Sequence, residues 1–397
     1  MWRYHHGATP AATLNVTGVR TGRSDRIAEI DALRGFALLG ILVANIVYFA
    51  SGYPAHLAAD PTYASRLDSA TTWLTAFLID TKFYLLFSFL FGYSFTLQMD
   101  SAARADARFT PRFLRRLGGL FVLGVLHAVL LFHGDILTTY ALLGLILLAL
   151  RKVSTTAALV SALMLTVAVA VIVLLVGNPV AADSAEAVIE GARTTDAFRG
   201  GPGSVVAEHL RLVPAQLVSN AGQAALALSA FLVGLAAGRH RVLSDLDRYV
   251  HLLRRIQWFG YPVGLAGALV FASGGGTRNA GTMAVGLLTA PLLAAAYGAS
   301  ALQLVHSRTG TRLARSFAAA GRMALTNYIG QSVICVLVFT GCGFGLVGRI
   351  APPVVILIAF AIFGSQLVTS TWWMSRHRYG PLEWILRFVT YARRPSP

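Results

Sequence analysis

Charged residues are scarce in this chain. Asp, Glu, Lys and Arg make up 13% of its 397 residues, whereas hydrophobic residues make up 56%. Soluble domains carry roughly a quarter charged residues, so the composition excludes an ordinary soluble protein. Acidic residues are especially few, 17 against 33 Lys and Arg, which gives a formal net charge of +16. The basic residues stand between apolar runs and form no continuous patch, so we expect no nucleic-acid partner.

Cysteine is almost missing as well. The two cysteines, Cys335 and Cys342, cannot build a disulfide framework, and no spacing typical of a zinc site occurs. We expect both to be small buried residues, and we expect no bound metal. The start of the chain also lacks the pattern of a cleaved signal peptide, because a polar stretch precedes the first apolar run. The first run is therefore expected to remain in the mature protein.

Long apolar runs are what the chain has instead. A helix needs roughly 20 apolar residues to cross the hydrocarbon core of a bilayer, and about ten runs approach or exceed that length. The pattern predicts an all-α protein, a polytopic integral membrane bundle of about ten transmembrane helices. The predicted spans are 31–50, 78–98, 114–132, 135–150, 155–176, 216–237, 257–273, 282–304, 323–346 and 351–374.

Basic residues gather in alternate connections between these spans. The positive-inside rule assigns such connections to the cytoplasm, so both termini are predicted to be cytoplasmic. The basic segments are 20–26, 104–116, 151–152, 239–255, 308–322 and 376–394.

The chain divides into a cytoplasmic N-terminal segment, 1–30, a transmembrane bundle, 31–375, and a cytoplasmic amphipathic tail, 376–397. In the tail, Pro381 suits the first turn of a helix and Glu383 the positive end of its dipole. We find no internal repeat.

Two segments leave alternatives open. Residues 177–214 form the longest outer loop and have room for a short interfacial helix. The pattern of residues 70–80 predicts either an amphipathic surface helix or an extension of the second span.

Polar groups interrupt the first span. Asp31 and Arg34 are one helical turn apart and can pair. Asn45 follows Arg34 by eleven residues, close to three full turns, so both lie on one face about 16 Å apart. Ionisable groups in a membrane are costly and mark functional sites, although Arg34 alone also suits a snorkelling anchor.

A second group surrounds a short connection between two spans. His127 lies inside the third span, and His133 and Asp135 stand in a turn so short that the two helices must be antiparallel neighbours. Asp135 suits an N-cap of the next helix. His127 is a candidate general base, and the alternative is a buried histidine bonded to a neighbouring helix.

The remaining candidates are spread along the chain. Lys82, toward the outer end of the second span, is either a snorkelling anchor or a site residue. Asn327 and Gln331 share one helical face with Tyr328 adjacent, and suit interhelical hydrogen bonds or a binding site. His56 lies in an outer loop.

Several stretches together resemble the YeiB-like bacterial membrane proteins, the domain-of-unknown-function family 418. The resemblance covers nearly the whole chain in the same order, and it implies a multi-pass protein of a bacterial cytoplasmic (inner or plasma) membrane. The stretches are IDALRGFALLGILVANI, KFYLLFSFLFG, LHAVLLFHGDILTTYALLG, GRMALTNYIGQSVICVLVF and GPLEWILR.

The first span is also distantly similar to heparan-α-glucosaminide N-acetyltransferase-type membrane acyltransferases. Those enzymes have an Asp and an Arg-Gly at the cytoplasmic end of a span, an Asn eleven residues on and a catalytic His after a further eleven. The matching positions here are Asp31, Arg34, Asn45 and His56. Acyltransferases of the acyltransferase-three type have a His where Asn45 stands, so the first similarity is the nearer one.

The resemblance implies transfer of an acyl group from cytoplasmic acyl-CoA to an extracytoplasmic hydroxyl or amine of a sugar, lipid or envelope precursor. Arg34 would bind the donor's phosphates, His127 or His56 would act as the base, oriented by Asp135, and Asn45 would stabilise the oxyanion. Acyl-CoA is then a co-substrate, with no tightly bound cofactor. The predicted partners are the bilayer, the donor, the acceptor and a second copy in a homo-oligomer. The predicted substrate-binding residues are Asp31, Arg34, Lys82, His133, Asn327, Tyr328 and Gln331.

Two other functions fit the same residues. In a transporter or exporter of a small solute, the polar face would line a pathway, with Asp31 and Arg34 as a gate and His127 or Asp135 relaying protons. In a non-catalytic scaffold, the same groups would only hold helices together.

Overall fold

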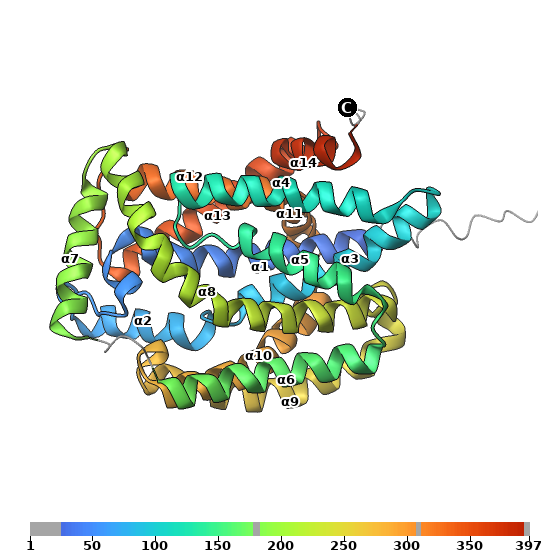
Figure 1. The fold of residues 1–397 in the computed structure, drawn as a ribbon, viewed down its shortest axis with the longest axis horizontal. Coiled ribbons are helices and arrows are strands. Elements are labelled where there is room, and N and C mark those ends of the chain that lie inside the picture. Colours follow the sequence, from blue (N-terminus) through green and yellow to red (C-terminus); the bar gives the residue numbers. More distant parts are fainter. Residues whose placement is uncertain (1–24, 178–182, 307–310, 393–397) are drawn as a thin grey trace, which may run out of the picture.

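The computed structural model describes residues 25–177, 183–306 and 311–392, and this part of the chain is helical with connecting turns (Figure 1). The predicted all-α fold is confirmed. Residues 1–24 of the predicted N-terminal segment, 178–182 of the predicted outer loop and 393–397 of the tail lie outside the described residues. The α-helices are α1 Asp25–Ala50, α2 Arg66–Leu78, α3 Phe83–Arg104, α4 Phe109–Leu130, α5 Leu137–Ala149, α6 Thr155–Val176, α7 Ala185–Arg199, α8 Pro202–Arg239, α9 Leu246–Ser273, α10 Ala280–His306, α11 Thr311–Arg322, α12 Ala324–Phe339, α13 Pro352–Met374 and α14 Pro381–Tyr391.

Eight helical segments of the described chain are long and apolar enough to cross a membrane. The count becomes nine if α11 and α12, which meet at a bend of 82°, form one broken span. These segments coincide with eight of the predicted spans. The chain is therefore a multi-pass membrane protein, and the placement of both termini in the cytoplasm stays a prediction.

The other two predicted spans are shorter than expected. The 135–150 run yields α5, whose 13 residues extend about 20 Å and fall short of a bilayer core of about 30 Å. The 323–346 run yields α12, which ends at Phe339 before a turn. Apolarity located a helix at both places, but the length of each helix depends on where the chain turns.

The two uncertain segments are now defined. The predicted outer loop at 177–214 contains α7 and the first turns of α8, which continues through Pro214 without a break. Residues 70–80 belong mainly to α2, a separate helix with a capping box between Ser65 and Asp68. A turn divides α2 from α3, and the two together form one apolar segment, Arg66–Arg104.

Helix α1 is the centre of the bundle. Of its apolar window 61% is buried, against 50% or less in the other candidate spans. It lies between a group formed by α6, α9 and α10 and a group formed by α4, α12, α13 and α14 (Figure 1). Of the polar residues of the first span, Asp31 is buried, and Arg34 and Asn45 are half-buried.

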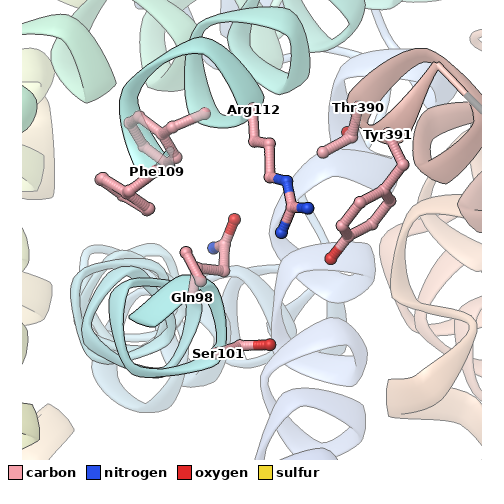
Figure 2. A pocket seen from close by; sticks show the side chains of 8 residues that line it. Gln98, Ser101, Phe109, Arg112, Thr390 and Tyr391 are labelled. Carbon is pink, nitrogen blue, oxygen red and sulfur yellow. The ribbon is translucent and has the colours of Figure 1, made fainter. Parts of the chain in front are cut away.

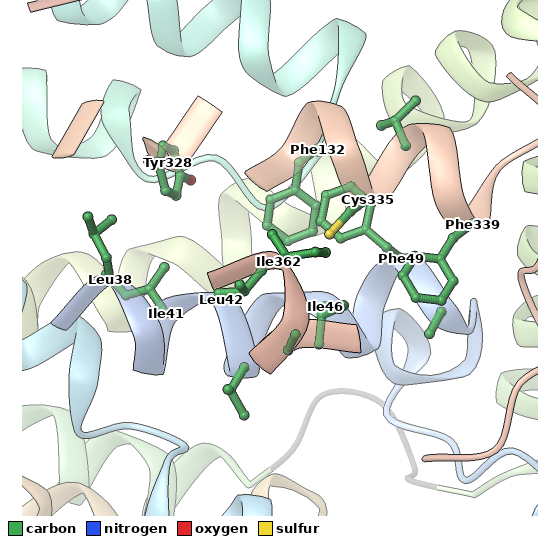
Figure 3. Packing of buried hydrophobic residues seen from close by; sticks show 14 of the residues in the cluster. Leu38, Ile41, Leu42, Ile46, Phe49, Phe132, Tyr328, Cys335, Phe339 and Ile362 are labelled. Atoms are coloured by element: carbon green, nitrogen blue, oxygen red, sulfur yellow. The ribbon is translucent and has the colours of Figure 1, made fainter. Parts of the chain in front are cut away.

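The largest apolar cluster joins α1 to α12 and α13 (Figure 3). Leu42 and Ile46 of α1 pack with Cys335 and Phe339 of α12 and with Ile362 of α13. Cys335 is fully buried, as expected, whereas Cys342, also expected to be buried, is only half-buried because it lies in the turn after α12; both cysteines are free thiols.

Glycine lets two helix pairs approach very closely. A Cβ atom at Gly35 or Gly321 would overlap the backbone of the opposite helix where α1 crosses α11. Gly92 and Gly234 have the same relationship where α3 crosses α8. Small residues drive such close packing in membranes, where water expulsion contributes little. The α1–α11 crossing fixes the end of α1 that carries Asp31 and Arg34.

Helix α14 packs against α4 and borders a small open pocket with α3 (Figure 2). Its Glu383 lies in the first turn, as expected, but the carboxylate binds a different helix. Its Oε1 accepts hydrogen bonds from the backbone N of Leu325 (2.7 Å) and of Thr326 (3.0 Å), and its Oε2 accepts one from Thr326 Oγ1 (2.6 Å). Glu383 thus caps α12 and holds the predicted amphipathic tail against the bundle.

Candidate functional site

A buried aspartate, histidine and serine lie in line between α4, α5 and α12. Asp135 Oδ1 is 2.8 Å from His127 Nδ1, and His127 Nε2 is 2.8 Å from Ser332 Oγ. His127, Asp135 and Ser332 are 1%, 3% and 4% exposed. We call these three residues the buried triad.

The local sequence explains how Asp135 reaches His127. After α4 the chain turns back at once, and α5 runs antiparallel to α4 as the short connection predicts. Asp135 Oδ2 accepts hydrogen bonds from the backbone N and the Oγ1 of Thr138, both 2.8 Å long, at the start of α5. Gly124 on α4 leaves room for this turn, since a Cβ there would lie 2.6 Å from the Thr138 nitrogen. Asp135 is therefore both a helix cap and the partner of His127.

The hydrogen bonds fix the roles of the two ring nitrogens. An ionised carboxylate only accepts, so His127 Nδ1 carries the proton that faces Asp135. In the neutral ring Nε2 then accepts from the Ser332 hydroxyl. This is the arrangement in which an imidazole can take a proton from a serine hydroxyl while a carboxylate stabilises the resulting cation.

Sequence reasoning missed Ser332. It lies one residue after the candidate Gln331, but serine is common in membrane helices and its partner is 205 residues away in the chain. The available signal was its position four residues after Tyr328, on the same helical face. The Tyr328 ring centroid is 5.0 Å from that of His127, and its buried hydroxyl lies beside the backbone of Ile136 without a hydrogen bond of standard geometry.

Asn327 and Gln331 bind α13, as the interhelical alternative predicts. Asn327 Nδ2 donates to Ser370 Oγ (2.9 Å), and Gln331 Nε2 donates to Gln366 Oε1 (2.8 Å). Gln366 Nε2 in turn donates to the carbonyl of Asn327 (2.9 Å). These hydrogen bonds fasten α12 to α13 next to the buried triad.

At the basic end of α1, Arg34 forms the predicted ion pair with Asp31, with Nη1 to Oδ1 at 2.6 Å. Its Nη2 also donates to Ser94 Oγ on α3 (2.5 Å). Asp31 is 4% exposed. Asn45, further along α1, is half-buried and has no hydrogen-bond partner among the described residues.

Lys82 is not a snorkelling anchor. It is 2% exposed, its Nζ donates to the carbonyl of Ala76 (2.8 Å), and the ammonium lies 5.5 Å from the centroid of the Phe271 ring. A snorkelling lysine would extend its charge to water. Lys82 instead connects α2, α3 and α9.

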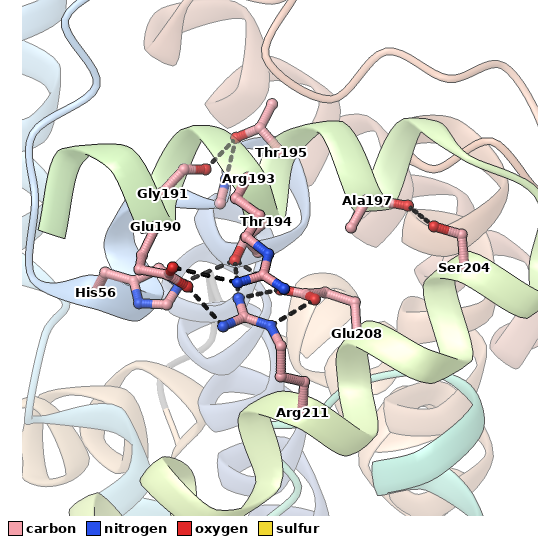
Figure 4. A network of polar contacts seen from close by, with 11 residues as sticks. His56, Glu190, Gly191, Arg193, Thr194, Thr195, Ala197, Ser204, Glu208 and Arg211 are labelled. Carbon is pink, nitrogen blue, oxygen red and sulfur yellow. Dashed lines mark hydrogen bonds and ion pairs between the residues drawn. The ribbon is translucent and has the colours of Figure 1, made fainter. Parts of the chain in front are cut away.

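The end of the bundle opposite Arg34 holds a separate polar network on α7, α8 and the loop after α1 (Figure 4). His56 Nε2 is 2.9 Å from Thr194 Oγ1, which donates to Glu208 Oε1 (2.7 Å) and accepts from Arg211 Nη2 (2.9 Å). A hydroxyl has one proton to donate, so His56 donates through Nε2 and its Nδ1 is left as an acceptor. Arg211 also binds Glu190 (2.6 Å).

The network shifts the pKa values of His56, Glu208 and Arg211. Burial, and after it the nearby Arg211 guanidinium, lowers the pKa of His56. Burial raises the pKa of Glu208, but hydrogen bonds from Arg211 and Thr194 outweigh burial and leave that pKa below its usual value. The hydrogen bond to Glu208 raises the pKa of Arg211.

Two buried histidines lie between this network and the buried triad. His133 and His209 are 4% and 2% exposed, and their ring centroids are 5.9 Å apart. His209 Nδ1 lies 3.2 Å from the carbonyl of Val129, whereas neither ring nitrogen of His133 has a hydrogen-bond partner in the described chain. The structure thus brings His127, His133 and Asp135 to one end of the bundle and leaves Asp31 and Arg34 at the other. Within the described residues, no cluster of three or more His, Cys, Asp or Glu could hold a metal ion.

A bundle of apolar spanning helices around buried polar groups defines a polytopic helical membrane protein. The chain belongs to the YeiB-like family, whose model, described as "Protein of unknown function (DUF418)", matches residues 237–393. Uncharacterized protein YxaH of Bacillus subtilis (strain 168) is 33% identical over 93% of this chain and 95% of its own length.

Two further relatives match over nearly the same extent. An uncharacterized 39.9 kDa protein in the amylase 3′ region of Bacillus acidopullulyticus is 29% identical over 93% of this chain and 95% of its own length. Uncharacterized protein YeiB of Escherichia coli (strain K12) is 27% identical over 92% of this chain and 96% of its own length. No solved structure matches the chain.

Proposed function

We propose that the protein is a membrane acyltransferase in which the buried triad activates the Ser332 hydroxyl. The observation that carries the proposal is the line from Asp135 through His127 to Ser332, with both contacts at 2.8 Å. A histidine that only fastens two helices needs one partner. The second bond, to a carboxylate that also caps a helix, orients the ring so that Nε2 faces the serine hydroxyl.

The chemistry follows from these positions. Ser332 Oγ attacks the carbonyl carbon of an acyl thioester while His127 Nε2 takes the hydroxyl proton, and His127 returns that proton to the departing thiolate. The acyl group is then an ester on Ser332. A hydroxyl or amine of the acceptor attacks this ester, gives its proton to His127, and Ser332 recovers its proton from His127 as the ester bond breaks.

Donor and acceptor approach from opposite ends. The donor is a cytoplasmic acyl-CoA, whose negative phosphates suit the basic end of the bundle beside Arg34. The acceptor is a hydroxyl or amine of a sugar, lipid or envelope precursor that enters at the end marked by His56 and His133. We assign Asn45, whose amide has no partner among the described residues, as the group that donates a hydrogen bond to the oxyanion. The compartment that fits this scheme is the bacterial cytoplasmic membrane.

The triad is closed to substrate in this conformation, because the His127 and Ser332 side chains are buried and bonded to each other. Transfer therefore requires α12 to move away from α4, as lids and helices move in many enzymes.

The deciding experiment incubates the purified protein with labelled acetyl-CoA, without acceptor, and looks for label on Ser332 by peptide mass spectrometry. We expect label in the wild type and none in Ser332→Ala or His127→Ala. Ser365→Ala is the matched control, since Ser365 Oγ bonds only the carbonyl of Ile362 in its own helix. His56→Ala tests the second candidate base and should keep the label. Unlabelled wild-type protein that nevertheless transfers acyl groups would rule out the Ser332 ester.

Proton-coupled transport of a small solute is a second candidate, and His133 is the observation that favours it. A fully buried ring without a partner on either nitrogen suits a path in which water passes protons. Solute uptake into proteoliposomes without any acyl donor would favour transport, and acyl transfer in detergent would favour the first proposal.

A further inference from the structure

Three arginines of α4 and α14 lie near one another at the basic end of the bundle, and one of them, Arg112, borders the small pocket (Figure 2). Arg112 lines the pocket and its guanidinium lies 5.3 Å from the centroid of the Tyr391 ring. Arg387 lies 4.5 Å from the centroid of the Tyr379 ring and 5.0 Å from that of Tyr391. Arg116 is one turn further along α4 from Arg112. We call Arg112, Arg116 and Arg387 the arginine cluster.

The arginine cluster has no acidic partner of its own. None of the ion pairs among the described residues includes any of its members. The Nε atoms of Arg116 and Arg387 are buried without a hydrogen bond. The charged groups that act on Arg116 are Arg34 and Arg387, both positive, and Glu383.

Glu383 carries one negative charge against the three positive charges of the cluster, and its carboxylate oxygens accept hydrogen bonds from the start of α12 rather than from these arginines. Stacking on tyrosine faces stabilises a guanidinium by only about 1 kcal/mol. Like charges therefore stand close together at the edge of a low-dielectric bundle, and each has N–H donors to spare. Such a site is completed by an anion.

The charges and hydrogen-bond donors of the site suit a phosphate. Guanidinium groups bind phosphate oxygens in pairs of parallel hydrogen bonds, and gathered arginines suit a dianionic group better than a single carboxylate. Neutral donors on α3 flank the same pocket, namely the Ser101 hydroxyl and the second amide hydrogen of Gln98, whose first is donated to the carbonyl of Ser94. We propose that the arginine cluster binds a phosphate-bearing ligand between α3, α4 and α14.

Two sources carry this chemistry, the phosphates of a nucleotide such as coenzyme A and the headgroup of an anionic phospholipid. The nucleotide source rests on the proposed acyl transfer, with Arg34 as the nearby positive charge that acts on Arg116. The lipid source holds whether or not the protein transfers acyl groups.

The test measures binding, so its outcome is separate from that of the acyl-transfer assay. Full-length protein is titrated with coenzyme A in detergent, and phosphatidylglycerol retained from nanodiscs is counted by native mass spectrometry. We expect Arg116→Gln and Arg387→Gln each to weaken one of these interactions about 10-fold, as the loss of a charge-assisted pair implies. Arg116→Lys should restore part of the binding, because charge remains and the planar fork does not.

The matched control is Arg115→Gln, which removes the same charge from the neighbouring, exposed position of α4 and should change binding less than 2-fold. Circular dichroism and size-exclusion chromatography of each variant keep loss of fold apart from loss of ligand. Weaker coenzyme A binding identifies the nucleotide, and loss of retained lipid identifies the headgroup. Equal binding of both probes by the wild type and the cluster variants, or equal loss in Arg115→Gln, overturns the proposal.

Discussion

His127 Nε2 and Ser332 Oγ lie 2.8 Å apart although 205 residues separate them in the chain. The contact joins α4 to α12, and Asp135 completes it from the start of α5. All three groups are buried, so each hydrogen bond is strong and the loss of any one leaves a polar atom without a partner.

The first prediction concerns the serine itself. Ser332→Ala should reduce acyl transfer about a thousandfold or more, since residues that act as one unit lose most of the rate together. Ser332→Cys keeps a nucleophile and should keep measurable label from acetyl-CoA. Transfer is measured in membranes with labelled donor. Activity of Ser332→Ala within a few-fold of wild type would contradict the role of Ser332 as nucleophile.

The second prediction separates the two roles of Asp135. Asn caps helices about as well as Asp, so Asp135→Asn should change the free energy of unfolding by less than about 1 kcal/mol. The amide presents an N–H group to His127 Nδ1, which cannot accept the Nδ1 proton as the carboxylate does. Transfer should therefore fall about a thousandfold. Thermal unfolding and the acyl-transfer assay are run on the same samples.

Asp135→Ala is the comparison for that variant. It removes the cap and leaves His127 Nδ1 unpaired, which should cost about 2–4 kcal/mol of stability. If Asp135→Asn loses as much stability as Asp135→Ala, the carboxylate has a structural role only.

The third prediction is a pH dependence of stability that arises in the polar network around His56, Glu208 and Arg211. Burial and Arg211 lower the pKa of His56 below 6.5, the value of a free histidine. Below pH 6.5 the unfolded chain therefore binds a proton that the folded chain refuses. The stability that neutral His56 contributes is complete above pH 6.5 and is lost as the pH falls toward the folded pKa.

His56→Gln should make the melting temperature depend less on pH below about pH 6.5 than it does in the wild type. Glu208, whose pKa is also lowered, acts in the same direction but only below about pH 4.5, where the unfolded carboxylate gains its proton. Melting curves of the purified protein across this pH range are the measurement. A wild-type protein that becomes more stable on acidification from pH 6.5 would contradict the assignment.

The fourth prediction concerns the closest helix crossing. Gly321→Ala would place a Cβ against the carbonyl oxygen of Asp31 and force α1 and α11 apart, at a cost of about 3 kcal/mol or more. Gly118→Ala is the control, since nothing lies within 4 Å of a Cβ at that position of α4. Alanine there should stabilise the helix by about 0.5–1 kcal/mol. Unfolding in mixed micelles compares the two variants, and equal stability would show that the α1–α11 crossing adjusts freely.

Local pattern determined most of the fold. Apolar runs predicted the helices because a spanning helix must be continuous in its own sequence. The Asp31–Arg34 pair and the contact of Asp135 with its own helix end were also predictable, since each partner lies within one turn or one short connection. The division of 177–214 into α7 and α8 was not, because polar and apolar residues are mixed there and no periodic signal stands out.

The sequence by itself determined that the chain is a helical membrane protein and that His127, Asp135 and Arg34 are costly groups in an apolar setting. Only the tertiary structure decided their partners. Ser332 joins His127 across 205 residues, and α14 brings Arg387 to Arg116 from the far end of the chain. Apolar periodicity tells which face of a helix is buried, but several helices could cover that face. The close glycine crossings and helix ends select the one that does, and that choice assembles both the buried triad and the arginine cluster.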